Sequence, residues 1–575
     1  MDCRDKIISE DYADFIIGVD NEFENVREKY RDDCIMFGSV NYGIIYKELS
    51  DFNNNTKAGE ITVSSGKNLL EYNYYQIPKL YSLMDTAALE ETGSIKLQNF
   101  NGLELKGKDI VIGFISDGID VYNKLFRYSN GETRVIGAWD QTNQDLEPPI
   151  NMEYGSFLDK ELIDEELQKS TSTILDSLSY GSFHGTFEAG IAAGNISLED
   201  GFSSAAPLAD IAVVKLKPAK KYLKRYYYSD EDAEVYQEND IMTGIIFLTR
   251  LAASLNKALI ICIVTGSSQG AHNGFSVLGD LINQVGVRPG IGVSVASGNE
   301  GNTRHHYSGK LTDLNKYIDA EIRVEENLRG LSMELWAESP DIFTMEIISP
   351  SGEKIPKIAL GLTGSNEFKF LFQNTVVYLK YEIIEKRSGA QVIEVKIDNP
   401  SEGIWTFRIF GIVILNGNFN LWLPVKDMLS EETYFLKPDP FTTLTIPSDA
   451  FIPVSAAAYN DDTDGIFIDS GRGYTTNLYV KPTISAPGVN INGPTVNGQF
   501  IDMSGTSISA AITAGIMAQF MEWGARRDEG ANMSTVEIKN YLIRGATRRT
   551  DLEYPDREFG FGLINAYNSL DILKG

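Results

Sequence analysis

Cysteine and histidine are scarce in this sequence of 575 residues. It has only three cysteines and four histidines, which are Cys3, Cys34, Cys262, His184, His272, His305 and His306. Three scattered thiols cannot build a disulfide framework, so a reducing compartment is the simpler interpretation. Histidines and cysteines nowhere stand at the spacing of a zinc site, and we expect neither a bound metal nor another cofactor.

Basic residues are also few: 51 stand against 80 acidic ones, which gives a net charge of −29. Nucleic acids are therefore not expected as partners, because binding to phosphate backbones needs Lys and Arg. No apolar run is long enough to span a bilayer, so no membrane anchoring is expected. The N-terminus, MDCRDKIISEDYADFII, carries acids where a signal peptide carries bases, which favours a cytoplasmic location.

Four apolar runs without polar alternation dominate a long part of the chain. They are IVIGFI (110–115), IAVV (211–214), LIICIV (259–264) and IGVSVA (291–296). Such runs are typical of strands buried on both faces, and helical patterns lie between them. This alternation predicts an α/β fold with a mostly parallel sheet and helices on both faces. The same alternation of apolar strands and helices resumes after about residue 430 and includes a long apolar helix at 507–523.

A segment of different character interrupts this pattern. Between residues 315 and 428 short strand-like stretches follow one another, separated by turn residues such as those of Pro350-Ser351-Gly352. Many short alternating strands predict an antiparallel β-sandwich. Residues 1–76 are acidic and mixed, and they predict a small α+β unit. We therefore expect four parts: 1–76, the first part of the α/β domain at 77–314, the insert at 315–428, and the second part at 429–575.

Three glycine-containing motifs lie at the edges of the predicted sheet. They contain His184 at the start of a helix, Asn299 after a buried strand, and Ser507 at the start of the long helix. A serine hydroxyl needs a neighbouring base to become a nucleophile, and histidine is the base suited to neutral pH. The Ser507 N–H and the Asn299 amide could stabilise an oxyanion. Alone, each motif is typical of a helix cap, a structural histidine or a turn; together they favour catalysis.

The same motifs carry a resemblance to a known family. HGTFEAGIAAG, ASGNEG and SGTSISAA resemble the histidine, oxyanion-asparagine and nucleophile motifs of the subtilisin-like serine proteases, the subtilases. The resemblance spans about 77–308 and 430–575. It implies a subtilisin-like fold, a protein substrate, and catalysis by Ser507 and His184 with Asn299 in the oxyanion hole. It also implies an S1 pocket flanked by two segments, Val264-Thr265-Gly266 and Ala296-Ser297-Gly298.

Within that family the layout resembles the clostridial Csp germination proteases. This resemblance implies a jelly-roll insert, a prodomain at 1–76 that is cut near Gln76 and acts as a partner, and a spore-associated location. The active members cleave the precursor of a spore-cortex hydrolase, and sister proteins with broken triads act in germinant signalling. The resemblance also allows a structural calcium ion, although the sequence shows no diagnostic spacing of calcium ligands.

The aspartate motif departs from the family pattern. The strand IVIGFI is followed by Ser116-Asp117-Gly118, so that Ser116 occupies the usual aspartate position. Because successive strand side chains point to opposite faces, Asp117 is expected to point away from His184 unless a bulge shifts the register. Ser116 could accept a hydrogen bond from the imidazole but could not stabilise its cation by charge.

Two functions therefore compete at this stage. The first is a serine endopeptidase that cleaves a germination precursor, with Asp117 or Ser116 supporting His184. The second is a pseudoprotease that keeps the fold, turns over little and acts in germination signalling. A binding module centred on the β-sandwich is a third, less specific interpretation. Self-cleavage near Gln76 and labelling of Ser507 separate the first two hypotheses.

Overall fold

The computed structural model describes most of the chain from residue 91 onward and five strands before it. The described residues are Arg27, 12–18, 34–37, 42–48, 52–53, 62–63, and 91–571 without 100–101, 151, 153, 220–223, 225–226, 231, 237, 360 and 528–531. The chain divides into two compact units, 1–83 and 84–575. The expected cleavage site near Gln76 lies outside the described residues.

The N-terminal unit contains two small antiparallel sheets. Strands β1 (Tyr12–Gly18), β3 (Tyr42–Glu48) and β2 (Cys34–Phe37) form one sheet in this order, and β4 (Phe52–Asn53) pairs with β5 (Thr62–Val63). The short apolar runs CIMF and YGIIY supply β2 and most of β3. Ile45, on β3, is buried.

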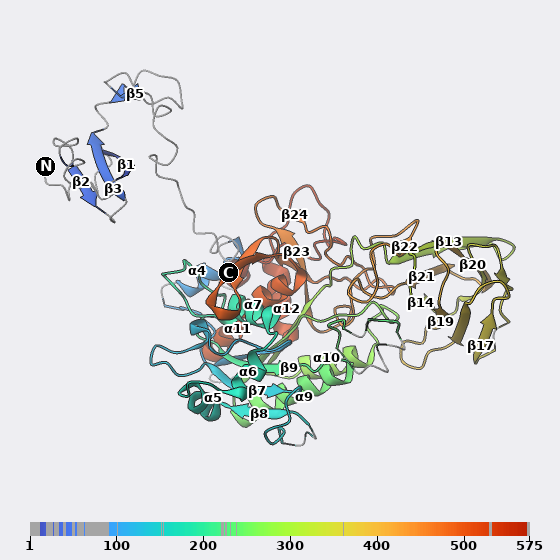
Figure 1. The fold of residues 1–575 in the computed structure, drawn as a ribbon, viewed down its shortest axis with the longest axis horizontal. Helices are drawn as coiled ribbons and strands as arrows, with labels where there is room; N and C mark the ends of the chain where they lie inside the picture. The colour runs from blue at the N-terminus through green and yellow to red at the C-terminus, as the bar shows by residue number, and fades with distance from the viewer. Residues whose placement is uncertain are drawn as a thin grey trace. The chain divides into compact units, whose positions relative to one another are not determined.

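A nine-stranded, mostly parallel sheet organises the second unit (Figure 1). Its order is β24-β23-β11-β10-β6-β9-β7-β8, and β25 pairs with β23; only β8 and β24 run antiparallel to their neighbours. The bounds are β6 Ile110–Ser116, β7 Val135–Asp140, β8 Ser156–Asp159, β9 Asp210–Lys215, β10 Ala258–Ile263, β11 Ile291–Ala296, β23 Val454–Asn460, β24 Gly465–Ile466 and β25 Ile484–Pro487. The four apolar runs form β6, β9, β10 and β11, which are buried along their whole lengths.

Helices cover both faces of this sheet, as the sequence predicts. Helices α7 (Phe183–Ala193) and α11 (Thr506–Arg527) pack on one face, and α9 (Glu238–Ser254) and α10 (Val277–Gly286) pack on the other. Alternate residues of β6 point to the two faces: Ile112 belongs to the core beneath α11, and Val111 to the core beneath α9. Other α-helices within the described residues are α4 Ser94–Gln98, α5 Lys160–Leu167, α6 Thr173–Ser179, α12 Thr535–Gly545 and α13 Ala566–Asp571.

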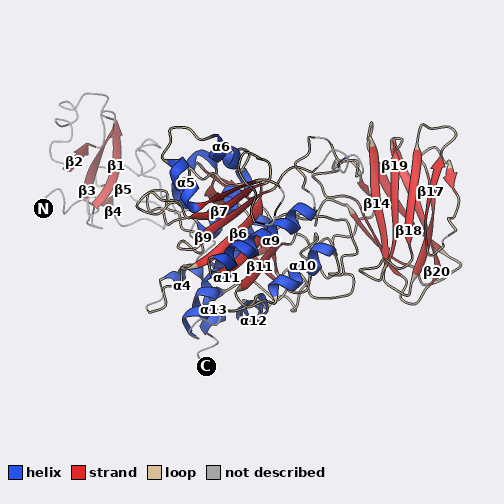
Figure 2. Ribbon diagram, turned by 90° about the horizontal axis from the view of Figure 1, so that it is seen from below, coloured by secondary structure: helices blue, strands red, loops and turns tan. Residues whose placement is uncertain are grey.

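Two antiparallel sheets face each other in the inserted domain, which forms a body of strands of its own (Figure 2). One sheet has the order β12-β21-β14-β19-β18-β17 and the other β16-β15-β20-β13-β22, and side chains of both share one apolar core. The bounds are β12 His306–Lys310, β13 Tyr317–Val324, β14 Gly330–Ala337, β15 Ile342–Ile348, β16 Lys354–Ile355, β17 Thr363–Lys369, β18 Val376–Glu382, β19 Gln391–Asp398, β20 Gly403–Val413, β21 Asn418–Trp422 and β22 Tyr434–Phe435. The sandwich thus includes β12 and β22, outside the expected 315–428.

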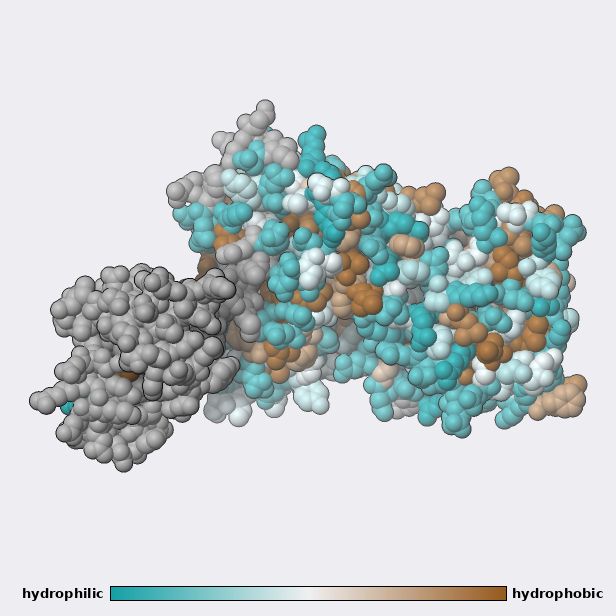
Figure 3. All heavy atoms as spheres, turned by 90° about the horizontal axis from the view of Figure 1, so that it is seen from above, coloured by the Kyte–Doolittle hydropathy of each residue, from teal (hydrophilic) through white to brown (hydrophobic). Residues whose placement is uncertain are grey.

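On the face drawn in Figure 3 the described residues are mainly hydrophilic, and hydrophobic side chains gather in small separate patches. Within the described residues, no helix combines the length and the apolar character needed to cross a bilayer.

Candidate active site

A cavity of about 1200 Å³ lies where the three glycine-containing motifs meet. Asp117 follows β6, Thr265 follows β10 and Asn299 follows β11, so that one edge of the parallel sheet brings them together. The opening turns of α7 and α11 add His184 and Ser507, and all five residues line the cavity. Strand ends and helix N-termini thus converge on one hollow, as is typical of open α/β sheets.

Ser507 and Asn299 face the same point beside Gly505. A Cβ atom built on Gly505 would lie 3.6 Å from Ser507 Oγ and 3.5 Å from Asn299 Nδ2. The amide orientation follows from Thr506, because its N–H and its hydroxyl both donate to Asn299 Oδ1 at 3.1 Å. Asn299 Nδ2 is consequently the donor directed to the cavity, next to the nucleophile expected from the sequence.

The carboxylate of Asp117 lies against the first turn of α7. It accepts hydrogen bonds from the backbone N–H groups of His184, at 3.0 Å, and of Gly185, at 2.7 Å. The expectation that Asp117 points away from His184 is therefore wrong. Strand β6 ends at Ser116 and Gly118 adopts a φ of 120°, so the alternation of side chains stops one residue before Asp117.

Several groups act on the charge of Asp117. Burial raises the pKa of this carboxyl above its usual value, while the N–H groups of Gly185 and His184 and the positive charge of His184 oppose the shift. Gly185 is required here, because a Cβ at this position would lie 2.9 Å from Asp117 Oδ1 and would overlap the carbonyl oxygen of Gly118. The site thus holds a carboxylate close to the histidine.

The His184 side chain is exposed and stands edge-on to the ring of Phe183, with 5.5 Å between ring centroids. Among the described residues, none forms a hydrogen bond with either nitrogen of the His184 ring. Ser116, expected as a substitute for the aspartate, instead places its hydroxyl 3.0 Å from Glu188 Oε2 and 3.3 Å from Asp117 Oδ1. Asp117 therefore contacts the backbone at His184, while Ser116 lies between the two carboxyl groups, and neither residue is hydrogen-bonded to the His184 ring.

The residues expected to flank the S1 pocket divide into two groups. Val264, Thr265, Gly266 and Gly298 line the cavity. Ala296 and Ser297 do not, because both are buried in the sheet edge, where the Ser297 N–H donates to the carbonyl of Ala456. These two residues hold the wall of the cavity in place.

Thr445 closes the space between the two walls and was not expected from the sequence. Its N–H donates to the carbonyl of Ser297 at 3.0 Å, and the next N–H, of Ile446, donates to the carbonyl of Ser267 at 2.8 Å. A Cβ at either Gly266 or Gly298 would overlap the Thr445 side chain. Gly266 and Gly298, one in each wall of the cavity, therefore leave room for the Thr445 side chain between them.

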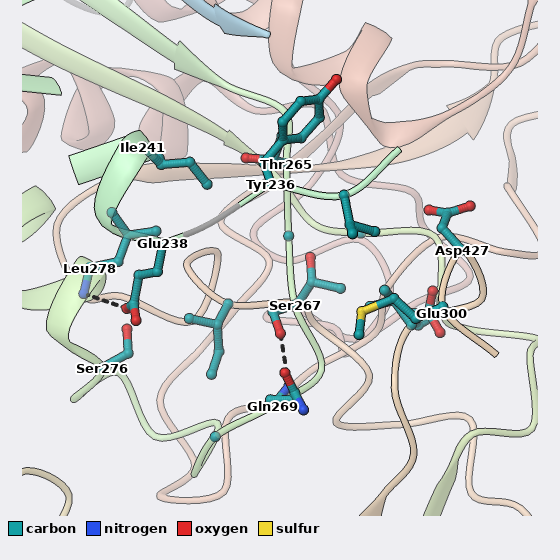
Figure 4. A pocket seen from close by; sticks show the side chains of 18 of the residues that line it. Tyr236, Glu238, Ile241, Thr265, Ser267, Gln269, Ser276, Leu278, Glu300 and Asp427 are labelled. Atoms are coloured by element: carbon teal, nitrogen blue, oxygen red, sulfur yellow. Dashed lines mark hydrogen bonds between the residues drawn. The ribbon is translucent and has the colours of Figure 1, made fainter. Parts of the chain in front are cut away.

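Acidic side chains from several elements surround the cavity, and the inserted domain supplies part of its wall. Figure 4 shows Glu238 on one side and Glu300 and Asp427 on the other, with the 265–269 segment between them. Glu334, on β14 of the insert, accepts hydrogen bonds from the N–H of Gly270 at 2.9 Å and from Trp336 Nε1 at 2.8 Å. Burial raises the pKa of Glu334 to about 7. Within the described part of the chain no group of three or more His, Cys, Asp or Glu residues is placed to hold a metal ion.

Comparison with known proteins gives matches along most of the chain. The Subtilase family matches residues 107–320 and 411–562, together more than half of the sequence, and the gap falls in the inserted sandwich. The structure is similar to that of the Clostridium perfringens CspB protease, with a TM-score of 0.75 and 27% identity, covering 85% of this chain and 99% of that one.

Two curated proteins match over parts of their length. Serine protease AprX of Bacillus subtilis (strain 168) is 33% identical over 130 residues, which are 20% of this chain and 27% of AprX. The PII-type proteinase of Lactococcus lactis subsp. cremoris is 23% identical over 530 residues, 83% of this chain and 26% of that proteinase. The chain spans about a quarter of the length of these curated relatives.

Proposed function

This chain belongs to the subtilase family of serine proteases, and we propose that it is an endopeptidase that hydrolyses peptide bonds through an acyl-enzyme intermediate. The observation that carries the proposal is the meeting of Ser507, Asn299, His184 and Asp117 at one cavity. A hydroxyl, a base, an oxyanion donor and a carboxylate are the groups that serine proteolysis needs. The motifs of Ser507, His184 and Asn299 are those of the family, whereas Asp117 stands one residue after the usual aspartate position.

The proposed reaction uses these groups in two steps. Ser507 Oγ attacks the scissile carbonyl carbon while His184 takes its proton, and the Ser507 N–H and Asn299 Nδ2 stabilise the oxyanion. The amine leaves with the proton from His184. Water then attacks the acyl carbon, again with His184 as base, and releases the acid product and Ser507. Asp117 stabilises the imidazolium formed in each step.

A fluorophosphonate probe tests the proposal. Incubated with the full-length chain, it is expected to form one covalent adduct, located by peptide mass spectrometry at Ser507. An active chain is also expected to cut itself near Gln76 and release its proposed prodomain. A chain that stays at full length and takes up no probe would rule out the endopeptidase.

That outcome would favour the second candidate, a pseudoprotease that acts in germination signalling. One observation supports this candidate: the exposed His184 ring is not hydrogen-bonded to any described residue and stands beside the bulky Phe183. Catalytic hydrogen bonds are often formed only when substrate binds, so this geometry leaves the endopeptidase as the leading proposal.

The proposed substrate is a spore-germination precursor protein, the precursor of a cortex hydrolase, cleaved in the cytoplasm or the spore. The similarity to the CspB protease supports this choice, together with the resemblance of the layout to the Csp germination proteases. Incubating the chain with such a precursor is expected to give one shortened product, and a precursor left intact by a probe-reactive chain would exclude this substrate.

Asn299→Ala is expected to lower kcat by about 10²–10³-fold with little change in KM, because one oxyanion donor is lost in the transition state only. Steady-state hydrolysis of a peptide anilide measures both constants. Asn416→Ala, an exposed position of the inserted domain, is the matched control and should leave them unchanged. A rise in KM at constant kcat would contradict the assigned role.

Thr445→Gly is expected to widen the S1 pocket and to raise kcat/KM for large apolar P1 residues relative to alanine by about tenfold or more. The side chain preceding the scissile bond must lie near Gly298, next to Asn299, where Thr445 now fills the space. Thr445→Val keeps the shape of the side chain and should keep the parent's ratio. Anilides with Ala, Leu and Phe at P1 measure the ratio, and an unchanged ratio would contradict the prediction.

A further inference from the structure

A second carboxyl group is buried behind Asp117. Glu188 lies on α7 one turn after His184, and only 3% of its surface is exposed. Most of its neighbours on this helix are apolar or small. Within the described chain its hydrogen-bond partner is Ser116, whose Oγ lies 3.0 Å from Glu188 Oε2.

Ser116 links this carboxyl to that of Asp117. Its Oγ lies 3.3 Å from Asp117 Oδ1 as well, so one hydroxyl stands between two carboxyl groups. A hydroxyl carries a single proton and can donate to only one of them. Both contacts are full hydrogen bonds, and not one proton shared between two acceptors, only when one carboxyl is protonated and donates to Ser116, which then donates to the other carboxyl.

The surroundings decide which carboxyl carries the proton. Asp117 accepts two backbone N–H groups and lies near the imidazole, whereas Glu188 has no such donor among the described residues. Burial raises the pKa of Glu188 well above its usual value, and the negative charge of Asp117 raises it further.

The titratable groups that interact with this pair are Cys262, Tyr236, Lys215 and His184. The thiol and the phenol are themselves held neutral by burial, and Lys215 Nζ donates to the carbonyls of Ser177 and Tyr180.

We propose that Glu188 is a neutral carboxylic acid and a positioning residue for catalysis, which donates to Ser116 and thereby directs the Ser116 hydroxyl onto the ionised Asp117. The inference rests on the proposed endopeptidase and adds a residue to its site. A neutral Glu188 leaves one negative charge behind the imidazole. An ionised Glu188 would draw the Ser116 proton to itself and would leave Asp117 without this donor.

Three substitutions test the chain of hydrogen bonds through activity. Glu188→Gln keeps a donor for Ser116 and should retain kcat within about threefold, since a hydrogen bond of similar strength replaces the first. Glu188→Leu keeps the volume but no donor and should lower kcat about 10- to 100-fold, as expected for a lost hydrogen bond to a charged group, with KM unchanged. Ser116→Ala should lower kcat as much as Glu188→Leu does. The double variant that combines Ser116→Ala with Glu188→Leu should have a kcat no lower than either single variant, because both substitutions break the same chain of hydrogen bonds.

A purely structural role of Glu188 would give a different pattern. It would change the melting temperature and lower the folded fraction, and Glu188→Leu and Glu188→Gln would then have equal kcat per folded molecule. The pH profile adds a second criterion: any alkaline decline of kcat that comes from ionisation of Glu188 should disappear in Glu188→Gln. Equal kcat in the two variants, or an additive double variant, would overturn the proposal.

Infrared spectroscopy tests the proton without any turnover. At neutral pH the difference spectrum between the parent chain and Glu188→Gln should show the carbonyl band of a buried protonated carboxylic acid, shifted by carbon-13 labelling of glutamate. The difference is taken because Glu334, with a pKa of about 7, gives a band of its own in both chains. The absence of such a band would overturn the proposal. Because this readout needs no active serine, a chain that fails to react with the fluorophosphonate probe would refute the proposed function and still report on Glu188.

Discussion

Replacing Ser507 by alanine is expected to lower kcat for peptide hydrolysis by about 10⁶-fold, because the nucleophile is lost and water must attack unaided. The remaining rate should come from the Asn299 amide, the backbone N–H of residue 507 and substrate binding. The measurement is hydrolysis of a peptide anilide by purified variant and parent chains. Labelling by a fluorophosphonate probe and self-cleavage near Gln76 should disappear together with turnover.

The matched control for this variant is Ser254→Ala. Ser254 is exposed at the last residue of α9, where its hydroxyl donates to the carbonyl of Leu251. This variant should keep the parent's kcat and its probe labelling. If Ser507→Ala retained most of the activity, the nucleophile would lie elsewhere and the proposed mechanism would be wrong.

Asp117→Asn is expected to lower kcat by about 10⁴-fold, the loss seen when an amide replaces the orienting carboxylate of a serine protease. The amide oxygen can still accept one N–H of the first turn of α7, so the fold should be kept, but the imidazolium loses its counter-charge. Steady-state kinetics measure the loss, and a melting temperature close to the parent's shows that α7 is intact.

Ser116→Asp in the Asp117→Asn background separates the two candidate positions for the aspartate. The register of the sequence alone predicts rescue by Ser116→Asp. The structure predicts no rescue, because the side chain of residue 116 points to the buried Glu188 and would bring a second carboxyl beside it. Recovery of activity in the double variant would show that the carboxylate belongs at position 116.

Much of the fold follows from patterns of burial in the sequence. The runs that form β6, β9, β10 and β11 are apolar without alternation because both faces of these strands are covered by helices. Helix α11 was predictable for a related reason, since it is apolar around most of its circumference. Strands β7 and β8 and helices α5 and α6 were not predicted, because elements of four to eight residues carry too few positions to show a period.

The candidate site shows the same division between local and long-range information. Ser507, His184 and Asn299 were recognisable because each stands in a short motif with glycine neighbours. The direction of Asp117 was predicted wrongly, because side-chain alternation holds only inside a strand and the end of β6 cannot be fixed to one residue from the sequence. Glu188 and Thr445 gain their roles from partners more than 70 residues away in the chain, and only folding reveals such pairs.

The inserted sandwich begins a few residues after Asn299 and ends a few residues before Thr445, so that it joins the oxyanion segment to the residue that closes the pocket. The chain must leave and re-enter the protease domain at these two points, and Glu334 ties the loop at Gly270 to the sandwich between them. The sandwich is therefore joined at three points to segments that line the cavity.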